Sequence, residues 1–186
     1  MKDLTTLPDN LPIPVDDGAC DHLIGSRIPS VELKSTSGTL IDLSTIAGTV
    51  VIFFYPMTGR PDSPPMHHWN DIPGARGCTP QSCSFRDNYS KLEKLGVKVF
   101  GVTSQALPDQ KEAHARLALP YDLLNDTQFE LTKAMQLPTF EYESSTYIKR
   151  ITLISTNGII KKTFYPVFPP DKNVTDVIEW FQDNDI

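Results

Sequence analysis

The sequence predicts an α/β domain in which a mixed central sheet carries helices on both faces. Residues 49–55 and 97–102 are continuous apolar runs rich in β-branched and aromatic side chains, which is typical of central strands buried on both faces. Segments with apolar residues at helical spacing alternate with the strands. Near the end of the chain, Asn157-Gly158 separates two further apolar runs, and this dipeptide favours a tight antiparallel hairpin.

The N-terminal part is expected to combine an extension with a hairpin. Residues 1–21 are rich in proline and aspartate, and we expect them to lie over the surface of one domain formed by residues 22–186. Residues 31–33 and 39–43 alternate around Ser37-Gly38, which predicts an N-terminal hairpin. The central strand at 49–55 follows the hairpin.

Pro56 ends the central strand, and residues 56–74 contain five prolines in 19 residues without any periodicity. This stretch predicts a long loop, and loops of that length inside compact domains are usually functional or mobile. A helix follows with Thr79 as its N-cap and Pro80 in its first turn, and Gly96 ends it. The later predicted elements are a strand at 97–102, a helix at 109–119, a short strand at 121–124, a helix at 127–136, strands at 151–156 and 159–164, and a helix at 174–182.

Composition excludes several classes of protein. The chain has 17 basic and 23 acidic side chains, and a net charge of -6 argues against nucleic acid or an anionic membrane as its partner. No apolar run reaches the roughly 20 residues that span a bilayer, and the N-terminus lacks the pattern of a signal peptide. Three cysteines are too few for a disulfide scaffold. We therefore expect a cytoplasmic protein in which any disulfide is transient and catalytic.

The most informative residues are Cys78 and Cys83, which lie five positions apart at the start of a predicted helix. A thiol at a helix N-terminus is close to free amide donors and the positive end of the helix dipole, so its thiolate is favoured. A second thiol nearby can trap the oxidised form of the first. The pair indicates redox chemistry rather than packing.

Three stretches carry a resemblance to a known family: Val51-Ile52-Phe53-Phe54-Tyr55-Pro56, then Gly77-Cys78-Thr79-Pro80-Gln81-Ser82-Cys83-Ser84-Phe85-Arg86-Asp87, and Arg150-Ile151-Thr152-Leu153-Ile154 with Asn157-Gly158. They resemble the peroxiredoxins, and within them the peroxiredoxin Q (bacterioferritin comigratory protein) subgroup. The similarity runs from about Ser30 to the C-terminus. It implies a thioredoxin-like fold and an antioxidant peroxidase acting in cell redox homeostasis.

The resemblance also implies roles for individual residues. Cys78 matches the peroxidatic cysteine, whose thiolate attacks a hydroperoxide and becomes a sulfenic acid. Arg150 matches the cation that faces this sulfur, and Gln81 matches the residue that orients the arginine. Cys83 matches the resolving cysteine, and thioredoxin or a similar dithiol protein is the implied reductant. Arg76 ranks below Arg150 as the cation, and Lys149 is a further alternative.

Helix geometry constrains how Cys78 and Cys83 react. Five residues apart on an ideal helix, two Cα atoms lie about 8–9 Å apart on faces about 140° apart. A disulfide needs them within about 7 Å. The helix must therefore unwind locally after the sulfenic acid forms, which predicts a wound reduced state and an unwound disulfide state.

One part of the family pattern is absent. Peroxiredoxins usually carry Pro-x-x-x-Thr-x-x-Cys, but Ala75 and Asp71 stand where the threonine and the proline are expected. An insertion accounts for this: Pro56 then matches the motif proline, and the 56–74 loop lies between it and Gly77. In that arrangement Thr58 is a candidate for the hydroxyl that positions the peroxide.

Several other residues have ordinary explanations. Cys20 lies in a polar, loop-like segment and is expected to be incidental, and the adjacent histidines His67 and His68 lack the spacing of metal ligands. We expect no metal and no cofactor. The aromatic residues Tyr165, Phe168 and Trp180 are expected to be core, with residues 164–168 alternatively covering the rim of the active site.

Two other functions remain as alternatives to a peroxidase. A thioredoxin-type disulfide oxidoreductase would need Cys-x-x-Cys, and the five-residue step counts against it. A redox-sensing module that does not cycle is compatible with Ala75. Because the resolving thiol belongs to the same chain, we expect a monomer or a weak dimer.

Overall fold

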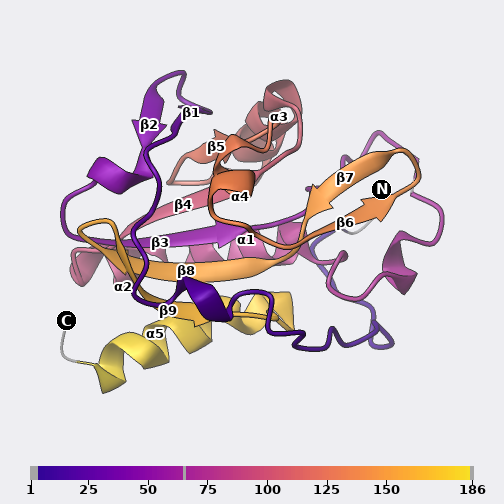
Figure 1. The fold of residues 1–186 in the computed structure, drawn as a ribbon. Coiled ribbons are helices and arrows are strands. Elements are labelled where there is room, and N and C mark those ends of the chain that lie inside the picture. Colours follow the sequence, from indigo (N-terminus) through magenta and orange to yellow (C-terminus); the bar gives the residue numbers. More distant parts are fainter. Residues whose placement is uncertain (1–3, 65, 185–186) are drawn as a thin grey trace.

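A computed structural model describes residues 4–64 and 66–184. Its main feature is a seven-stranded mixed sheet in the order β2-β1-β5-β4-β3-β8-β9 (Figure 1). The strands are β1 (Glu32–Ser35), β2 (Leu40–Asp42), β3 (Thr49–Phe54), β4 (Lys98–Thr103), β5 (Leu123–Asn125), β8 (Ile151–Thr156) and β9 (Ile159–Phe164). The predicted fold class, with its N-terminal hairpin and its hairpin at Asn157-Gly158, is confirmed.

Strand β3 is central because its sequence is apolar on both faces. It pairs in parallel with β4 and antiparallel with β8. Val50, Ile52 and Phe54 are buried in one core cluster. Val51, Phe53 and Tyr55 are buried in the other. This placement brings Tyr55 and the following Pro56 to the end of the sheet where the cysteine helix begins.

Helices cover both faces of the sheet. They are α1 (Cys78–Asp87), α2 (Tyr89–Lys94), α3 (Leu107–Leu117), α4 (Glu130–Ala134) and α5 (Asn173–Asp183), with 3₁₀ turns η1 (Asp21–Leu23), η2 (Leu43–Thr45), η3 (Trp69–Asp71) and η4 (Pro170–Lys172). Helices α1, α2 and α5, with the end of α3, pack in the cluster around Phe53. Helix α4 and turn η1 pack in the cluster around Ile52.

The predicted helix from Thr79 to Gly96 is wrong in two respects. It begins two residues earlier, with Gly77 rather than Thr79 as the N-cap, and it breaks into α1 and α2 at Asn88. The φ and ψ of Asn88 are -107° and 5°, and its side-chain nitrogen donates to the carbonyl of Ser84 at 3.0 Å. Asparagine competes in this way with the helical backbone, which explains the break.

The predicted helix at 127–136 is also shorter in the structure. The carboxylate of Asp126 accepts the backbone N–H groups of Leu131 and Thr132 and so caps α4 from outside. Phe129 has a left-handed φ of 55° directly before the helix. The chain therefore enters α4 only at Glu130. The helix predicted at 109–119 begins at Leu107 instead, and Ala118 ends it with a φ of 49°.

A third hairpin was not predicted. Strands β6 (Thr139–Tyr142) and β7 (Ser145–Ile148) form a two-stranded sheet beside the main sheet. Its turn places Glu143 at a φ of 52° without the asparagine or glycine that signals such a turn. The hairpin holds the 56–74 loop, because Trp69 of η3 contacts the rings of Phe140, Tyr142 and Tyr147. Loop and hairpin lie at the same end of the molecule (Figure 1).

Residues 4–21 are mostly exposed or half-buried, but they contribute two buried side chains. Leu4 is buried beside the 56–74 loop, and Cys20 is buried in a core cluster. Cys20 is therefore a core residue rather than part of a polar loop. Lys149 holds the extension by contacts to Asp17 at 2.9 Å and Tyr165 at 3.2 Å. None of the helices within the described residues has the length and apolarity needed to cross a membrane.

Candidate active site

Cys78 is the first residue of α1, and its position depends on the glycine before it. Gly77 has a φ of 110°, a conformation that L side chains rarely adopt. A Cβ there would lie 2.3 Å from Cγ of Pro170 in η4. Because Gly77 permits this close approach, α1 begins against η4 with Cys78 in its first turn. The Cys78 side chain is 3% exposed, and Sγ lies 3.6 Å from the carbonyl oxygen of Ala75.

Arg150 directs its guanidinium at this sulfur. It lies directly before β8, is 3% exposed, and its Nη2 is 3.2 Å from Cys78 Sγ. The same nitrogen contacts the carbonyl oxygens of Gly74, Ala75 and Arg76 at 3.2–3.3 Å. A buried guanidinium in this place stabilises negative charge on the sulfur, since the low dielectric strengthens the attraction.

Gln81 joins Arg150 to residues that the sequence did not single out. Its Oε1 accepts a hydrogen bond from Arg150 Nη1, and its Nε2 donates to Asn173 Oδ1 at 3.0 Å. Thr152 Oγ1 donates to the same oxygen at 2.6 Å. Gln81 is fully buried. Asn173 was missed because no local motif links it to a residue 92 positions earlier.

Cys83 lies in the same helix as Cys78, and both thiols are free. Cys83 is half-buried, and this burial raises the pKa of its thiol, an effect that Arg86 partly offsets. Its protonated thiol is a poor nucleophile, whereas Cys78 faces a cation. Because α1 is wound from 78 to 87, the two sulfurs belong to different faces of an intact helix.

A cavity of about 710 Å³ opens over Cys78. The 56–74 loop and residues from three other segments line it, among them Thr58, Arg60, Trp69, Arg76 and Gln105. Thr58 and Cys78 therefore face one space. The Thr58 hydroxyl donates to Gln105 Oε1 at 3.1 Å, and the carbonyl of Pro56 accepts a hydrogen bond from Thr103 at 2.8 Å.

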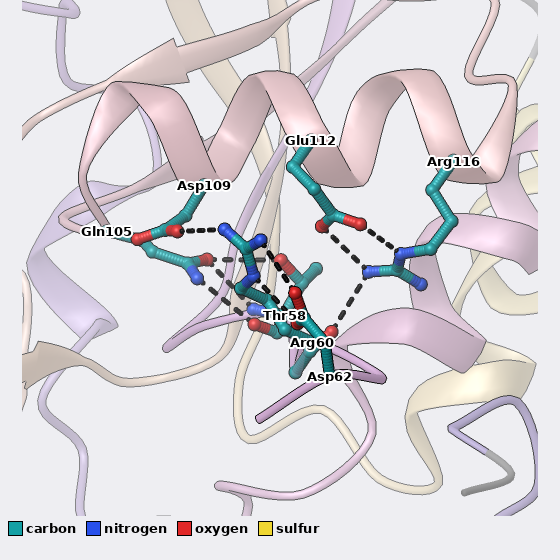
Figure 2. Close-up of polar contacts among 8 residues, drawn as sticks. Thr58, Arg60, Asp62, Gln105, Asp109, Glu112 and Arg116 are labelled. Carbon is teal, nitrogen blue, oxygen red and sulfur yellow. Dashed lines mark hydrogen bonds and ion pairs between the residues drawn. The ribbon is translucent and has the colours of Figure 1, made fainter. Parts of the chain in front are cut away.

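The first part of the loop is attached to α3. Arg60 contacts Asp109 at 3.1 Å and Asp62 at 3.0 Å, and Arg116 donates to the carbonyl of Gly59 at 2.9 Å (Figure 2). Gln105 also donates Nε2 to the carbonyl of Thr58 at 3.1 Å. These contacts hold the backbone around Thr58 in place at the wall of the cavity.

The other candidate residues lie away from the sulfur or are paired elsewhere. Arg76 lines the cavity and donates to the carbonyl of Thr6 at 3.3 Å, while Lys149 pairs with Asp17. His68 contacts Asp71 at 2.6 Å. Within residues 4–64 and 66–184, no group of three or more His, Cys, Asp or Glu side chains could hold a metal ion.

The aromatic residues near the C-terminus separate into two groups. Trp180 is only partly buried and packs beside Phe181 against the core cluster that includes α5, and Phe168 is also only partly buried, so neither is a core residue as predicted. Tyr165 instead lines a second cavity of about 330 Å³, which Arg150 also lines. Residues 165–167 of the 164–168 segment therefore line a cavity beside Arg150 that Cys78 does not line.

Comparisons with known proteins agree with this geometry. Residues 23–178 match the sequence profile of the Redoxin family. The chloroplastic peroxiredoxin Q of Suaeda salsa is 28% identical over 163 residues, which is 85% of this chain and 67% of that protein. The chloroplastic peroxiredoxin Q of Gentiana triflora is 27% identical over 192 residues, covering 98% of this chain and 79% of that protein. The chain spans about two thirds of the length of the Suaeda protein.

Solved structures share the fold. Peroxidoxin BcpB from Mycobacterium tuberculosis superimposes with a TM-score of 0.70 at 21% identity, covering 86% of this chain and 96% of that one. The bacterioferritin comigratory protein of Xanthomonas campestris has a TM-score of 0.67 at 18% identity, covering 94% and 98%. The chain belongs to the redoxin family, and it is a peroxiredoxin of the peroxiredoxin Q (bacterioferritin comigratory protein) subgroup.

Proposed function

We propose that this thiol-dependent peroxidase reduces hydrogen peroxide and organic hydroperoxides through Cys78 and forms an intramolecular disulfide with Cys83. The observation that carries the proposal is the 3.2 Å contact between Arg150 Nη2 and Cys78 Sγ at the start of α1. Arg150 holds a positive charge beside the sulfur before and during the reaction. Preorganised charge of this kind stabilises the transition state without reorganisation.

In the first step, the Cys78 thiolate attacks one oxygen of the hydroperoxide. A sulfur–oxygen bond forms, the oxygen–oxygen bond breaks, and the departing oxygen takes a proton and leaves as water or an alcohol. The Arg150 guanidinium stabilises the charge that develops on the departing oxygen. Thr58 is proposed to position the peroxide, since it lines the same cavity as Cys78. Pro56 and Gln105 fix the backbone around it.

In the second step, Cys83 attacks the sulfenic acid of Cys78, a disulfide forms and water leaves. The first turns of α1 unwind for this step, because an intact helix keeps the two thiols apart. A dithiol protein such as thioredoxin then reduces the disulfide by exchange and α1 rewinds. We propose a monomer or weak dimer, because the peroxidatic and the resolving thiol belong to one chain. We also propose a reducing compartment, the cytoplasm, because the disulfide is transient and catalytic. Residues 22–186 are the proposed catalytic domain and 1–21 its extension.

The test is peroxide-dependent turnover with thioredoxin and its reductase. The wild-type protein is expected to consume both hydrogen peroxide and cumene hydroperoxide, and Cys78→Ser is expected to abolish consumption. Cys83→Ser should be oxidised once at normal speed, fail to recycle, and become over-oxidised at Cys78. Normal cycling of Cys83→Ser would contradict the resolving role.

Assays on the wild-type protein also distinguish a peroxidase from the two alternative functions. A thioredoxin-type oxidoreductase would reduce insulin disulfides and ignore peroxide. A redox sensor would be oxidised by peroxide but would not turn over with thioredoxin. Sustained turnover without insulin reduction is the result that a peroxidase predicts.

A further inference from the structure

The buried polar contacts beside Cys78 extend to the start of α5. Gln81 contacts Arg150 through Oε1 and donates Nε2 to Asn173 Oδ1 at 3.0 Å, and Thr152 donates to the same oxygen at 2.6 Å. Gln81, Thr152 and Asn173 are all fully buried. We infer that Asn173 is a positioning residue that holds the Gln81 amide with its oxygen toward Arg150. The inference rests on the peroxidase function proposed above.

The oxygen and the nitrogen of the Gln81 amide require different hydrogen-bond partners. The Arg150 guanidinium can only donate hydrogen bonds, so it pairs with the oxygen of the Gln81 amide and repels its nitrogen. With the oxygen turned to Arg150, the buried nitrogen needs an acceptor on its other side, and Asn173 Oδ1 supplies it. Thr152 holds that oxygen in place. Without Asn173, the Gln81 nitrogen is buried and unpaired, so the orientation that anchors Arg150 is no longer favoured.

Asn173 also stabilises the wound form of α1. Gln81 lies between Cys78 and Cys83, in the segment that unwinds before the disulfide forms. Unwinding takes the Gln81 amide away from Asn173 and leaves the asparagine oxygen with Thr152 alone. A contact made in only one of two states shifts the equilibrium toward that state. Asn173 therefore favours oxidation of Cys78 and opposes its resolution by Cys83.

This double role predicts opposite changes in two steps. In the Cys83→Ser background, Asn173→Leu is expected to lower the second-order rate of Cys78 oxidation by about tenfold, because Arg150 loses its fixed position. With Cys83 present, the same substitution is expected to raise the rate of disulfide formation from the sulfenic acid by about threefold or more. Both steps are followed by rapid quenching and mass spectrometry. Over-oxidation at high peroxide should fall as a result.

Two further variants control for folding. Thr175→Val changes an exposed residue in the same turn of α5 and should leave both rates unchanged. Thr152→Val keeps the shape of a buried side chain and removes only the hydroxyl that holds Asn173, so it should move both rates in the same directions by smaller factors. It keeps the test valid if Asn173→Leu folds poorly.

The outcomes are distinct. Opposite changes in the two rates support the positioning role. Oxidation within about twofold of the Thr175→Val control, or a fall in both rates together, overturns it. Failure of the Cys83→Ser parent to react with peroxide instead overturns the proposed function, and the inference with it.

Discussion

At the scale of single residues, the side chain closest to the reaction after Cys78 is Arg150. Arg150→Met removes the charge 3.2 Å from Cys78 Sγ and is expected to lower the second-order oxidation rate by about 10²–10³-fold, the usual cost of one preorganised donor. Arg150→Lys keeps the charge but not the planar fork that spans Cys78 and Gln81, so it should recover only part of the rate. Rapid-quench oxidation in the Cys83→Ser background measures both. A change below about twofold for Arg150→Met would contradict the assignment.

A second residue-scale prediction concerns the third cysteine. Burial raises the pKa of the Cys20 thiol to about 12, so this thiol stays protonated at neutral pH. Alkylation of the folded reduced protein, followed by mass spectrometry, should therefore label Cys78 and Cys83 and leave Cys20 unmodified. Cys20→Ala should keep peroxidase turnover normal and lower the free energy of unfolding by about 1–2 kcal/mol, because Cys20 packs in the core. Rapid labelling of Cys20 would refute its core position.

The resemblance of short sequence motifs to the peroxiredoxins was enough to nominate Cys78, Arg150 and Gln81, and the structure places Arg150 in contact with the other two. It was not enough for Asn173 and Thr152, whose types and spacing carry no signal. Buried amide and hydroxyl partners of this kind depend on how β8 and α5 pack on α1. That packing emerges only when the whole domain is assembled.

At the scale of elements, the start of α1 depends on Gly77. Gly77→Ala places a Cβ 2.3 Å from Pro170 at a φ of 110°, so we expect α1 to shift from η4, the oxidation rate to fall, and the free energy of unfolding to drop by about 1–3 kcal/mol. Chemical denaturation and stopped-flow oxidation measure these changes.

The matched control is Gly96→Ala. Gly96 has a φ of 71° and open space around its Cβ position, so this variant carries the backbone strain without the steric clash. It should lose less stability than Gly77→Ala and keep its oxidation rate. Equal losses in the two variants would show that contact with Pro170 does not set the position of α1.

Periodicity predicted the strands and most helices, and it failed where side chains compete with the backbone. The helix break comes from Asn88. The start of α4 is set by the Asp126 carboxylate, which accepts the backbone N–H of Thr132 from six residues earlier in the chain. Hairpin β6–β7 escaped prediction because Glu143-Ser144 lacks the residues that favour a tight turn. Its packing on Trp69 also could not be foreseen, since the loop that carries Trp69 shows no pattern.

At the scale of the whole molecule, hydrogen bonds among Asp17, Lys149 and Tyr165 attach the N-terminal extension beside the site. Hydrogen bonds from Lys149 and then Tyr165 lower the pKa of the Asp17 carboxyl to about 2, below its usual value of about 3.8. The stabilisation is therefore complete above about pH 4 and is lost as the pH falls toward 2. The thermal midpoint of wild-type protein should exceed that of Asp17→Asn at neutral pH, and the difference should close across this acid range. A constant difference would contradict the coupling.

Composition predicted a surface extension and a single domain but not the contacts between them. Leu4 packs near Gly59, and Asp17 contacts Lys149 more than 100 positions away. Such contacts join segments with no sequence signal in common. For the same reason, the proline content of residues 56–74 predicted a loop but could not predict that contacts with distant segments hold this loop as a wall of the cavity.

The central claim is that Cys78, held beside Arg150 at the start of a wound α1, is a preorganised nucleophile for hydroperoxides. The most direct test is the second-order rate of Cys78 oxidation by hydrogen peroxide and cumene hydroperoxide, measured by stopped flow in the Cys83→Ser protein. We predict a rate above that of free cysteine by on the order of 10³ or more. A rate equal to that of free cysteine would contradict the claim.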